Sequence, residues 1–376
     1  MIYRDINNIV WLIPIRKIRN SLRNYMTKLI KDNEFIKLQN NYIIKELYNY
    51  KDKREKEKLL EKELNINNLS DFWQKYNKIN ESYNEICVYV GIGTGFFSEF
   101  NHIIMAILYC LVNKIKFKLY LINASNFSNG KGWEEFFIPF CNELIYNADT
   151  EFNNLFNFHK NDIEVLLPII KQKYGINYFT PDIYDKMRDG DFFGSHFSVK
   201  ELGIDGNIYH AFGIIAKNIF KFNSETKNEI NKLIKDINLP EKYVSFHIRA
   251  GDKITEFELI EPEKYIKSLK KYSYIKDIFI STDDYSIIKK LQNKYGSKYN
   301  IYTLTNKNEF GYNQGDFESL NKKDKYNHLI KLFASIEILL NSQLCIGSYT
   351  TNPSIFVGAI LGKSKFIEIN SLNFRV

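Results

Sequence analysis

The sequence contains little glycine and little proline, only 18 and 7 residues in a chain of 376. This scarcity excludes collagen-like repeats, Gly/Ser linkers and proline-rich architectures. No apolar run approaches the ~18 residues that indicate a membrane span. The best candidate, Ile9–Ile15, is short and contains Pro14, and Arg4 and Asp5 precede it without a small-residue cleavage site. We therefore expect a cytoplasmic or otherwise soluble protein with neither a signal peptide nor a transmembrane anchor.

Cysteine is also scarce, and the four cysteines (Cys87, Cys110, Cys141 and Cys345) form no Cys-x-x-Cys pair. Three of them lie inside apolar runs, so we expect buried free thiols rather than disulfides or a zinc site. Such usage is typical of a reducing compartment. No spacing of His, Asp or Glu indicates a metal site either, and we expect no metal.

The positive charge is confined to one segment of the chain. The net charge is +8, but Arg16–Lys62 holds 14 of the 52 Lys and Arg residues and only 7 of the 44 Asp and Glu residues. The rest of the chain is nearly neutral. A nucleic-acid-binding surface needs basic residues clustered across a folded face, so we expect no nucleic-acid partner.

Apolar residues make up 44% of the chain, with 26 Tyr and 29 Phe, which is enough for a large core. The length predicts two compact units plus an appendage. In residues 15–62, apolar side chains recur at alternating steps of three and four, from Ile15 to Leu29 and again up to Tyr50. This pattern predicts an N-terminal helical arm (1–82), a helical hairpin or short coiled coil. Its apolar stripe can pack on the body or pair two copies of the chain.

After residue 82 the sequence pattern changes to alternating strand and helix signals. A strand at 86–90, a glycine-rich turn at 91–95, a helix at 97–112 and a strand at 117–122 predict a parallel sheet in a first α/β domain (83–240). Phe96 stands where a dinucleotide-binding fingerprint would need glycine, so a plain tight turn explains the loop equally well. Helices are expected at 153–174 and 225–237, and a loop at 189–197.

The last third (241–376) reads as a doubly wound, Rossmann-like domain, because short β-rich runs alternate with helical patterns. The expected strands are 244–248, 278–281, 300–304, 344–346 and 365–369, and the expected helices are 262–271, 285–295, 326–340 and 353–361.

Polar residues follow three of these strands at their carboxyl ends, where open α/β sheets bind ligands. They are His247 at the end of the first strand with Arg249, Asp252 and Lys253 after it, Asp283 and Asp284 after the second strand, and Thr350, Thr351 and Asn352 after the fourth. Pro353 predicts a helix start, whose N–H groups and positive dipole end suit phosphate. Arg249 can bind phosphate bidentately and Lys253 adds a mobile charge. These groups suit a nucleotide diphosphate.

Each feature also has a purely structural explanation. Asp284 can serve only as the cap of the next helix, and Arg249 and Asp252 can form a structural ion pair. His102 and His328 are expected in the core or on the surface rather than as ligands.

Several motifs resemble the α-1,6-fucosyltransferase family, which comprises core fucosyltransferases and their rhizobial nodulation relatives. The resemblance covers roughly residues 85–376, and its most specific part is His-Ile-Arg-Ala-Gly-Asp-Lys at 247–253 with Glu256 after it. Supporting segments are Pro262–Ile266, Ile278–Asp284, Ser348–Asn352, Gly93–His102 and Gly132–Glu134.

Three departures from the family pattern concern the acceptor linkage more than the donor. Ala250 replaces the second of two adjacent arginines. The interval from Lys253 to Glu256 is one residue short, which leaves Glu258 as a rival acidic residue. Gly251 is more similar to the α-1,2-fucosyltransferases.

The resemblance implies a GT-B-like α/β fold, with two Rossmann-like domains facing a cleft. It also implies an inverting, metal-independent transfer of fucose from GDP-fucose to a glycan or glycoconjugate hydroxyl, without a cofactor. Arg249 and Lys253 would hold the diphosphate and Glu256 would polarise the acceptor hydroxyl. The implied donor-binding residues are Gly93, His247, Arg249, Asp252, Lys253, Asp283, Asp284, Tyr349, Thr350, Thr351 and Asn352. For Tyr349, core packing is equally plausible.

Three other functions stay open at this point. The chain could use another GDP-sugar, it could make an α-1,2 linkage, or it could bind a GDP-sugar without catalysis, since Ala250 and the short interval could have disabled the chemistry.

Overall fold

The computed structural model describes residues 24–25, 27–28, 60–61, 70–91, 94–122, 124–127, 131–145, 168, 171–172, 174–251, 258–269, 272, 274–370, 372 and 374. Most of the helical arm expected at 15–62 and most of the helix expected at 153–174 lie outside these residues. The chain divides into two compact units, Met1–Leu59 with Asn157–Tyr174, and Leu60–Phe156 with Gly175–Val376. The second unit contains all the elements discussed below.

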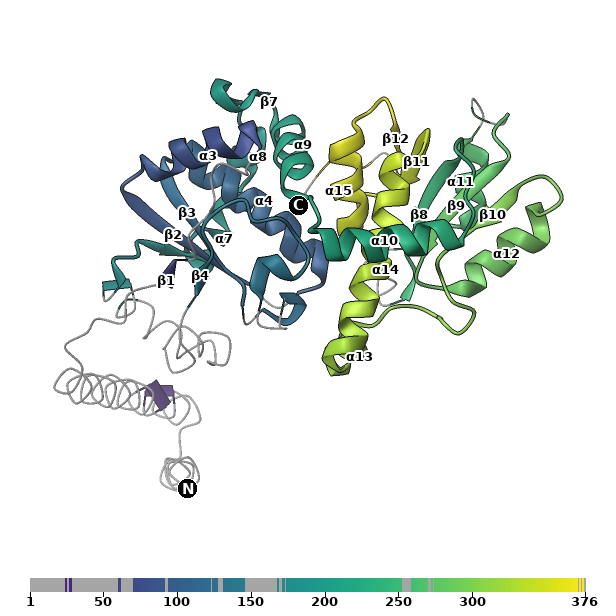
Figure 1. Ribbon diagram of the computed structural model, residues 1–376, viewed down its shortest axis with the longest axis horizontal. Helices are drawn as coiled ribbons and strands as arrows, with labels where there is room; N and C mark the ends of the chain where they lie inside the picture. Colours follow the sequence, from purple (N-terminus) through teal and green to yellow (C-terminus); the bar gives the residue numbers. More distant parts are fainter. Residues whose placement is uncertain are drawn as a thin grey trace, which may run out of the picture. The chain divides into compact units, whose positions relative to one another are not determined.

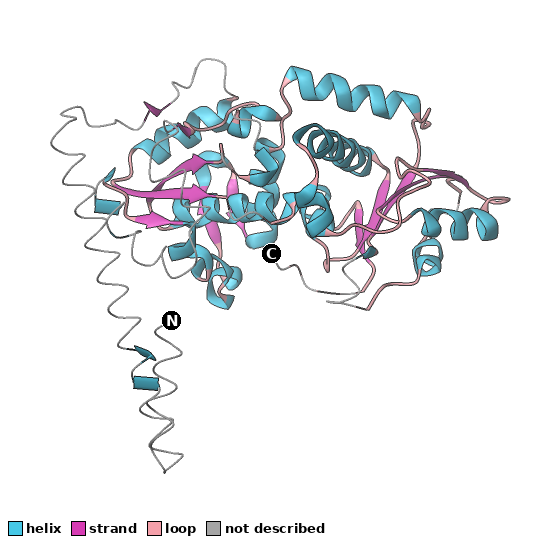
Figure 2. Cartoon of the chain, turned by 90° about the horizontal axis from the view of Figure 1, so that it is seen from below, coloured by secondary structure: helices cyan, strands magenta, loops and turns pink. Residues whose placement is uncertain are grey.

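A three-stranded parallel sheet forms the centre of the first α/β half (Figures 1 and 2). Its order is β3 (Ile115–Tyr120), β2 (Glu85–Val90), β5 (Tyr178–Phe179), and Cys87 of β2 lies opposite Phe117 on one side and Tyr178 on the other. The connection from β2 to β3 is α4 (Phe96–Val112), which is buried along nearly its whole length. From residue 103 to its end its sequence is apolar on all sides, as expected of a helix covered by other elements.

Two segments differ from their predicted structure. Leu60–Glu61, expected to be helical, is strand β1, which pairs antiparallel with β4 (Leu144–Ile145). The expected loop at 189–197 contains helix α8 (Gly190–Gly194), because the Asp189 side chain accepts a hydrogen bond from the Asp191 N–H at 2.7 Å and caps it.

Helix α3 (Asp71–Glu81) belongs with the α/β body, although the boundary predicted at residue 82 assigned it to the arm. Its Trp73 and Tyr76 are buried in the main core, and the Asn80 side chain hydrogen-bonds both backbone groups of Phe117 in β3. The remaining elements of this half are η2 (Ser125–Phe127), η3 (Gly132–Glu135), α7 (Thr180–Tyr184), η4 (Lys186–Arg188), β6 (Phe197–Val199), η5 (Lys200–Leu202), β7 (Ile204–Gly206), α9 (Ile208–Ile219) and α10 (Ser224–Asp236).

The second half is built on a five-stranded parallel sheet, as the sequence predicts. Its order is β10 (Asn300–Tyr302), β9 (Asp277–Thr282), β8 (Val244–Ile248), β11 (Leu344–Gly347), β12 (Phe366–Glu368). Every residue of the central strand β8 is buried, which suits a parallel strand covered on both faces. The helices are α11 (Pro262–Ser268), α12 (Tyr285–Tyr295), α13 (Gln314–Ser319), α14 (Lys322–Asn341) and α15 (Asn352–Leu361).

The two halves share one aromatic core, which sets the position of the site. The ring centroids of Phe97 in α4 and Phe356 in α15 are 5.0 Å apart, and those of Phe96 in α4 and Phe333 in α14 are 4.7 Å apart. Helix α10 also packs on α14, and α9 on α15. These contacts place the first turns of α4 and α15 beside each other, where the Asn101 side chain donates to the Asn352 carbonyl at 3.1 Å.

All four cysteines are buried and free, which confirms the prediction.

Candidate functional site

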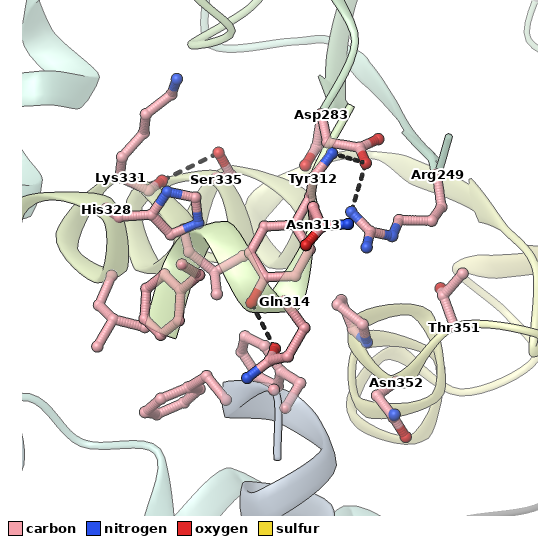
Figure 3. Close-up of a pocket in the computed structure, with 18 of the residues that line it drawn as sticks. Arg249, Asp283, Tyr312, Asn313, Gln314, His328, Lys331, Ser335, Thr351 and Asn352 are labelled. Atoms are coloured by element: carbon pink, nitrogen blue, oxygen red, sulfur yellow. Dashed lines mark hydrogen bonds and ion pairs between the residues drawn. The ribbon is translucent and has the colours of Figure 1, made fainter. Parts of the chain in front are cut away.

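A cavity of about 540 Å³ lies at the carboxyl ends of the strands of the five-stranded sheet (Figure 3). Both α/β halves contribute to its wall. The lining residues include Thr94–Ser98 and Asn126 from the first half, and His247–Arg249, Ser281–Asp283, Gly311–Gln314, His328, Ser335 and Thr351–Pro353 from the second.

The N-termini of α4 and α15 both reach this cavity. Gly95 is the N-cap of α4, and Thr351 is the N-cap of α15 with a proline in the first turn, as the sequence predicts. The first N–H groups of a helix have no partner within the helix, and the helix dipole makes this end positive. The cavity wall therefore offers anion-binding character from two directions.

His247 connects the central strand to the start of α15. Its Nδ1 lies 2.8 Å from the Ser354 Oγ and 3.3 Å from the Thr351 Oγ1. Burial, helped by the nearby Arg249 charge, lowers the pKa of His247 to about 3. The ring is therefore neutral near pH 7, which suits a residue that orders the loop.

Arg249 pairs with Asp283 across the ends of β8 and β9. The Asp283 carboxylate also accepts hydrogen bonds from the backbone N–H groups of Ala250 at 2.8 Å and Tyr312 at 2.9 Å. The Arg249 side chain is 18% exposed and lines the cavity. Asp283 thus joins its own strand end to the segment that carries Arg249 and to the loop that carries Tyr312. Asp252, suggested above as a structural partner of Arg249, lies outside the described residues.

Three predicted donor-binding residues lie elsewhere in the structure and are absent from the described cavity lining. Asp284 caps α12 by accepting from the Ser286 N–H at 2.8 Å, the structural role already considered for it. Tyr349 stacks on Phe366 with ring centroids 5.4 Å apart, and its hydroxyl lies 3.2 Å from that of Tyr209. The Thr350 hydroxyl lies 3.0 Å from that of Ser348.

Four further predicted residues, Gly93, Asp252, Lys253 and Glu256, lie outside the described residues, and their roles stay predictions. The rival Glu258 is described and exposed, and it is not part of the described lining.

The part of the cavity wall formed by Glu309, Gly311–Gln314 and helix α14 was not predicted from the sequence. The loop that carries Tyr312 follows β10, a fourth strand end with polar and glycine residues, so the strand-end rule would have found it. His328, expected in the core or on the surface, lines the cavity. Burial, Lys331 and Arg249 lower the pKa of His328, and Glu309 opposes this shift. No sequence signal marked that residue.

The Gly-Trp-Glu segment has a structural role. Gly132 has a φ of +56° and packs against the Glu143 carboxylate, which accepts from the Trp133 N–H at 2.9 Å. The Trp133 ring stacks against that of Phe137 in the aromatic core, with ring centroids 4.7 Å apart.

Within the part of the chain that the structure describes, no group of three or more His, Cys, Asp or Glu residues is placed to hold a metal ion. None of the described helices combines the length and the apolar character that crossing a membrane would require.

Residues 13–312 match the family of alpha-(1,6)-fucosyltransferase N- and catalytic domains. The chain belongs to this family. It is therefore a glycosyltransferase of the fucosyltransferase type. The expected α/β class, with a parallel sheet in each half, is confirmed.

Solved fucosyltransferase structures are similar to this fucosyltransferase-family chain at low identity. NodZ alpha-1,6-fucosyltransferase soaked with GDP-fucose is 12% identical with a TM-score of 0.45, and the match covers 76% of this chain and 94% of that one. POFUT1 in complex with GDP is 12% identical with a TM-score of 0.43, and the match covers 76% of this chain and 98% of that one. An Arabidopsis thaliana FUT1 variant in complex with GDP is 10% identical with a TM-score of 0.43, and the match covers 78% of this chain and 73% of that one. No curated protein sequence matches the chain.

Proposed function

We propose that this chain transfers fucose from GDP-fucose to a hydroxyl group of a glycan, in an α-1,6-like linkage with inversion and without a metal. The observation that carries the proposal is the meeting of Arg249 with the first turns of α4 and α15 in one cavity. The family and the GDP or GDP-fucose bound in similar structures supply the chemical class.

The charge distribution of the cavity suits a departing diphosphate. As the bond between the sugar and the phosphate breaks, negative charge grows on the phosphate oxygens, and preorganised donors stabilise it. Arg249 supplies a guanidinium with several N–H donors in a planar fork. The two helix N-termini supply backbone N–H groups and positive dipole ends. Together they can supply the stabilisation that we propose replaces a metal.

The proposed reaction is a single displacement. The acceptor oxygen forms a bond to C1 of fucose while the bond from C1 to the phosphate oxygen breaks, so the anomeric configuration inverts. The acceptor proton passes to the Glu256 carboxylate, and GDP leaves with the bonding electron pair. A carboxylate acting in this way must lie within hydrogen-bond reach of the hydroxyl.

Lys253 and Glu256 follow Gly251 in the sequence, and Gly251 packs against the backbone of Tyr312, which lines the cavity. We propose that Lys253 adds a second cation to the diphosphate. His247, buried and held by Ser354, would order the loop rather than exchange protons. Thr351 and Asn352 would contact phosphate or fucose from the start of α15.

The other functions left open are use of another GDP-sugar, an α-1,2 linkage, and GDP-sugar binding without catalysis. A thermal-shift panel of GDP, UDP, ADP and GDP-fucose identifies the nucleotide, an assay for fucose release or transfer separates catalysis from binding, and linkage analysis of the product separates α-1,6 from α-1,2. The proposal expects stabilisation by GDP and GDP-fucose but not by UDP or ADP, together with transfer. Stabilisation by GDP without any release of fucose would indicate either a binding protein or the use of another GDP-sugar.

Arg249→Ala should abolish stabilisation by GDP while leaving the far-UV circular dichroism spectrum unchanged. If that variant binds GDP as well as the wild type, the diphosphate role of Arg249 is wrong.

A further inference from the structure

The side chain of Arg249 contacts a second described residue besides Asp283, the aromatic ring of Tyr312. The Cζ atom of Arg249 lies 4.8 Å from the centre of that ring, and Figure 3 shows the guanidinium beside both partners. A planar guanidinium stacks well on an aromatic face while its edges stay available for planar recognition of phosphate. Asp283 and Tyr312 therefore constrain Arg249 in two different ways.

Tyr312 is itself held firmly at both ends. Its backbone N–H donates to Asp283 at 2.9 Å, and its hydroxyl donates to the Gln314 Oε1 at 2.6 Å. On the side chain, the ring centroids of His328 and Phe317 lie 5.6 Å and 6.0 Å away. The ring that supports Arg249 is thus part of a packed wall rather than a loose surface group.

The backbone geometry of two loops depends on this arrangement. Gly251, at a φ of +56°, lies so close to Tyr312 that a β-carbon on Gly251 would be 2.5 Å from the Tyr312 carbonyl oxygen. The Gly311 N–H also donates to the Asp283 carbonyl at 2.8 Å. The loop that carries Tyr312 is therefore fixed to the strand ends that carry Arg249 and Asp283.

We propose that Tyr312 is a positioning residue for the transfer reaction, which holds the Arg249 guanidinium in the orientation that receives the diphosphate. This inference rests on the proposed function, because it takes the diphosphate as the ligand of Arg249. Arginine has a long flexible side chain, and a ligand that must first order such a side chain binds more weakly. The ring of Tyr312 removes that ordering cost before the donor arrives.

The test is GDP binding, measured by calorimetry on the whole chain and five variants, three in a first series and two in a double-mutant cycle. Tyr312→Leu removes the aromatic face and should weaken GDP binding about tenfold, the size of a partly desolvated cation–π contact. Tyr312→Phe keeps the face and should remain within about threefold of the wild type. Tyr274→Leu is the matched control, because Tyr274 is 73% exposed and lies outside the described cavity lining; its GDP affinity should not change. Urea unfolding of each variant checks that the fold is intact.

A double-mutant cycle separates positioning from direct contact with the ligand. In an Arg249→Lys background the compact ammonium lacks the planar stack, so adding Tyr312→Leu should then weaken GDP binding less than about threefold. An equal tenfold loss in both backgrounds would mean that Tyr312 contacts the nucleotide itself, and it would overturn the proposal. So would an equal loss in Tyr312→Phe and Tyr312→Leu. If the wild type does not bind GDP at all, the proposed function fails instead.

Discussion

Gly311 approaches Gly251 so closely that a β-carbon on Gly311 would lie 2.8 Å from the Gly251 Cα atom. Both glycines have positive φ angles, +103° and +56°. Their contact joins the loop after β10 to the loop after β8, and it brings Tyr312 against Arg249. The absence of a side chain at two positions is thus a condition for building the cavity wall.

Gly251→Ala should destabilise the protein and weaken GDP binding. The positive φ costs about 1–2 kcal/mol for a residue with a β-carbon, and the contact with the Tyr312 backbone at 2.5 Å adds to that cost and displaces the loop. Urea unfolding and thermal shift with GDP measure the two effects. Gly203→Ala is the control, since its φ is +67° but no atom lies within 4 Å of the added carbon. Equal loss of GDP binding in both variants would contradict this account.

Asp283→Asn should lower both stability and GDP affinity. The carboxylate accepts from Arg249 and from the backbone N–H groups of Ala250 and Tyr312, and an amide would turn an NH₂ group toward one of these donors. We expect a loss of about 2–3 kcal/mol of unfolding free energy. Asp284→Asn provides the comparison, because asparagine caps helices as well as aspartate does and should leave both quantities unchanged. Wild-type stability in Asp283→Asn would mean that the fold does not depend on the contacts of the Asp283 carboxylate.

His247 makes the protein sensitive to acid. Its pKa is about 3 in the folded chain and about 6.5 in an unfolded one. Between these values the unfolded state binds more protons, so stability falls as the pH decreases from 6.5 toward 3. The loss from this residue at pH 5 is about 2 kcal/mol. Urea unfolding at pH 7.5 and pH 5 should show a smaller loss in His247→Asn; equal losses would exclude His247 as the cause.

Glu256→Gln should reduce transfer by ~10²-fold or more, as for removal of a general base, while GDP-fucose binding stays near normal. Glu258→Gln is the internal comparison, because the short interval after Lys253 leaves it as the rival. If the large loss appears in Glu258→Gln instead, the proposed assignment of the base is wrong. Transfer rate and donor affinity must both be measured, since a loss of binding would indicate a different role.

Transfer should be unaffected by a chelator. The proposal assigns stabilisation of the leaving diphosphate to Arg249, Lys253 and two helix N-termini. Rates measured in EDTA and in excess Mg²⁺ or Mn²⁺ should agree. Loss of activity in EDTA that is restored by a divalent ion would show that the proposed metal-independent mechanism is wrong.

Much of the second half could be predicted from the sequence, because each signal was local. Strand β8 and helix α12 have the bounds expected for them, and Pro353 marked the start of α15. Arg249, Asp283 and Thr351 could be assigned to the cavity because carboxyl ends of parallel strands meet at one edge. The same rule, applied to only three strand ends, missed Tyr312.

Other features could not be predicted because they depend on contacts between distant segments. The short helix at Gly190–Gly194 and the strand at Leu60–Glu61 carry no strong periodicity, and the strand forms by pairing with residues 144–145. Asp284 and Asp283 are neighbours with the same chemistry. One caps a helix and the other joins three loops, a difference that only the packing around them sets.

The sequence by itself determined the family, the alternation of strands and helices, and the strand ends at which polar residues gather, because these follow from motifs, periodicity and strand order. Only the tertiary structure decided which of those residues share a cavity. Side-chain direction and the close approach of Gly251 and Gly311 arise from long-range packing, so the stacking of Arg249 on Tyr312 has no local signature in the chain.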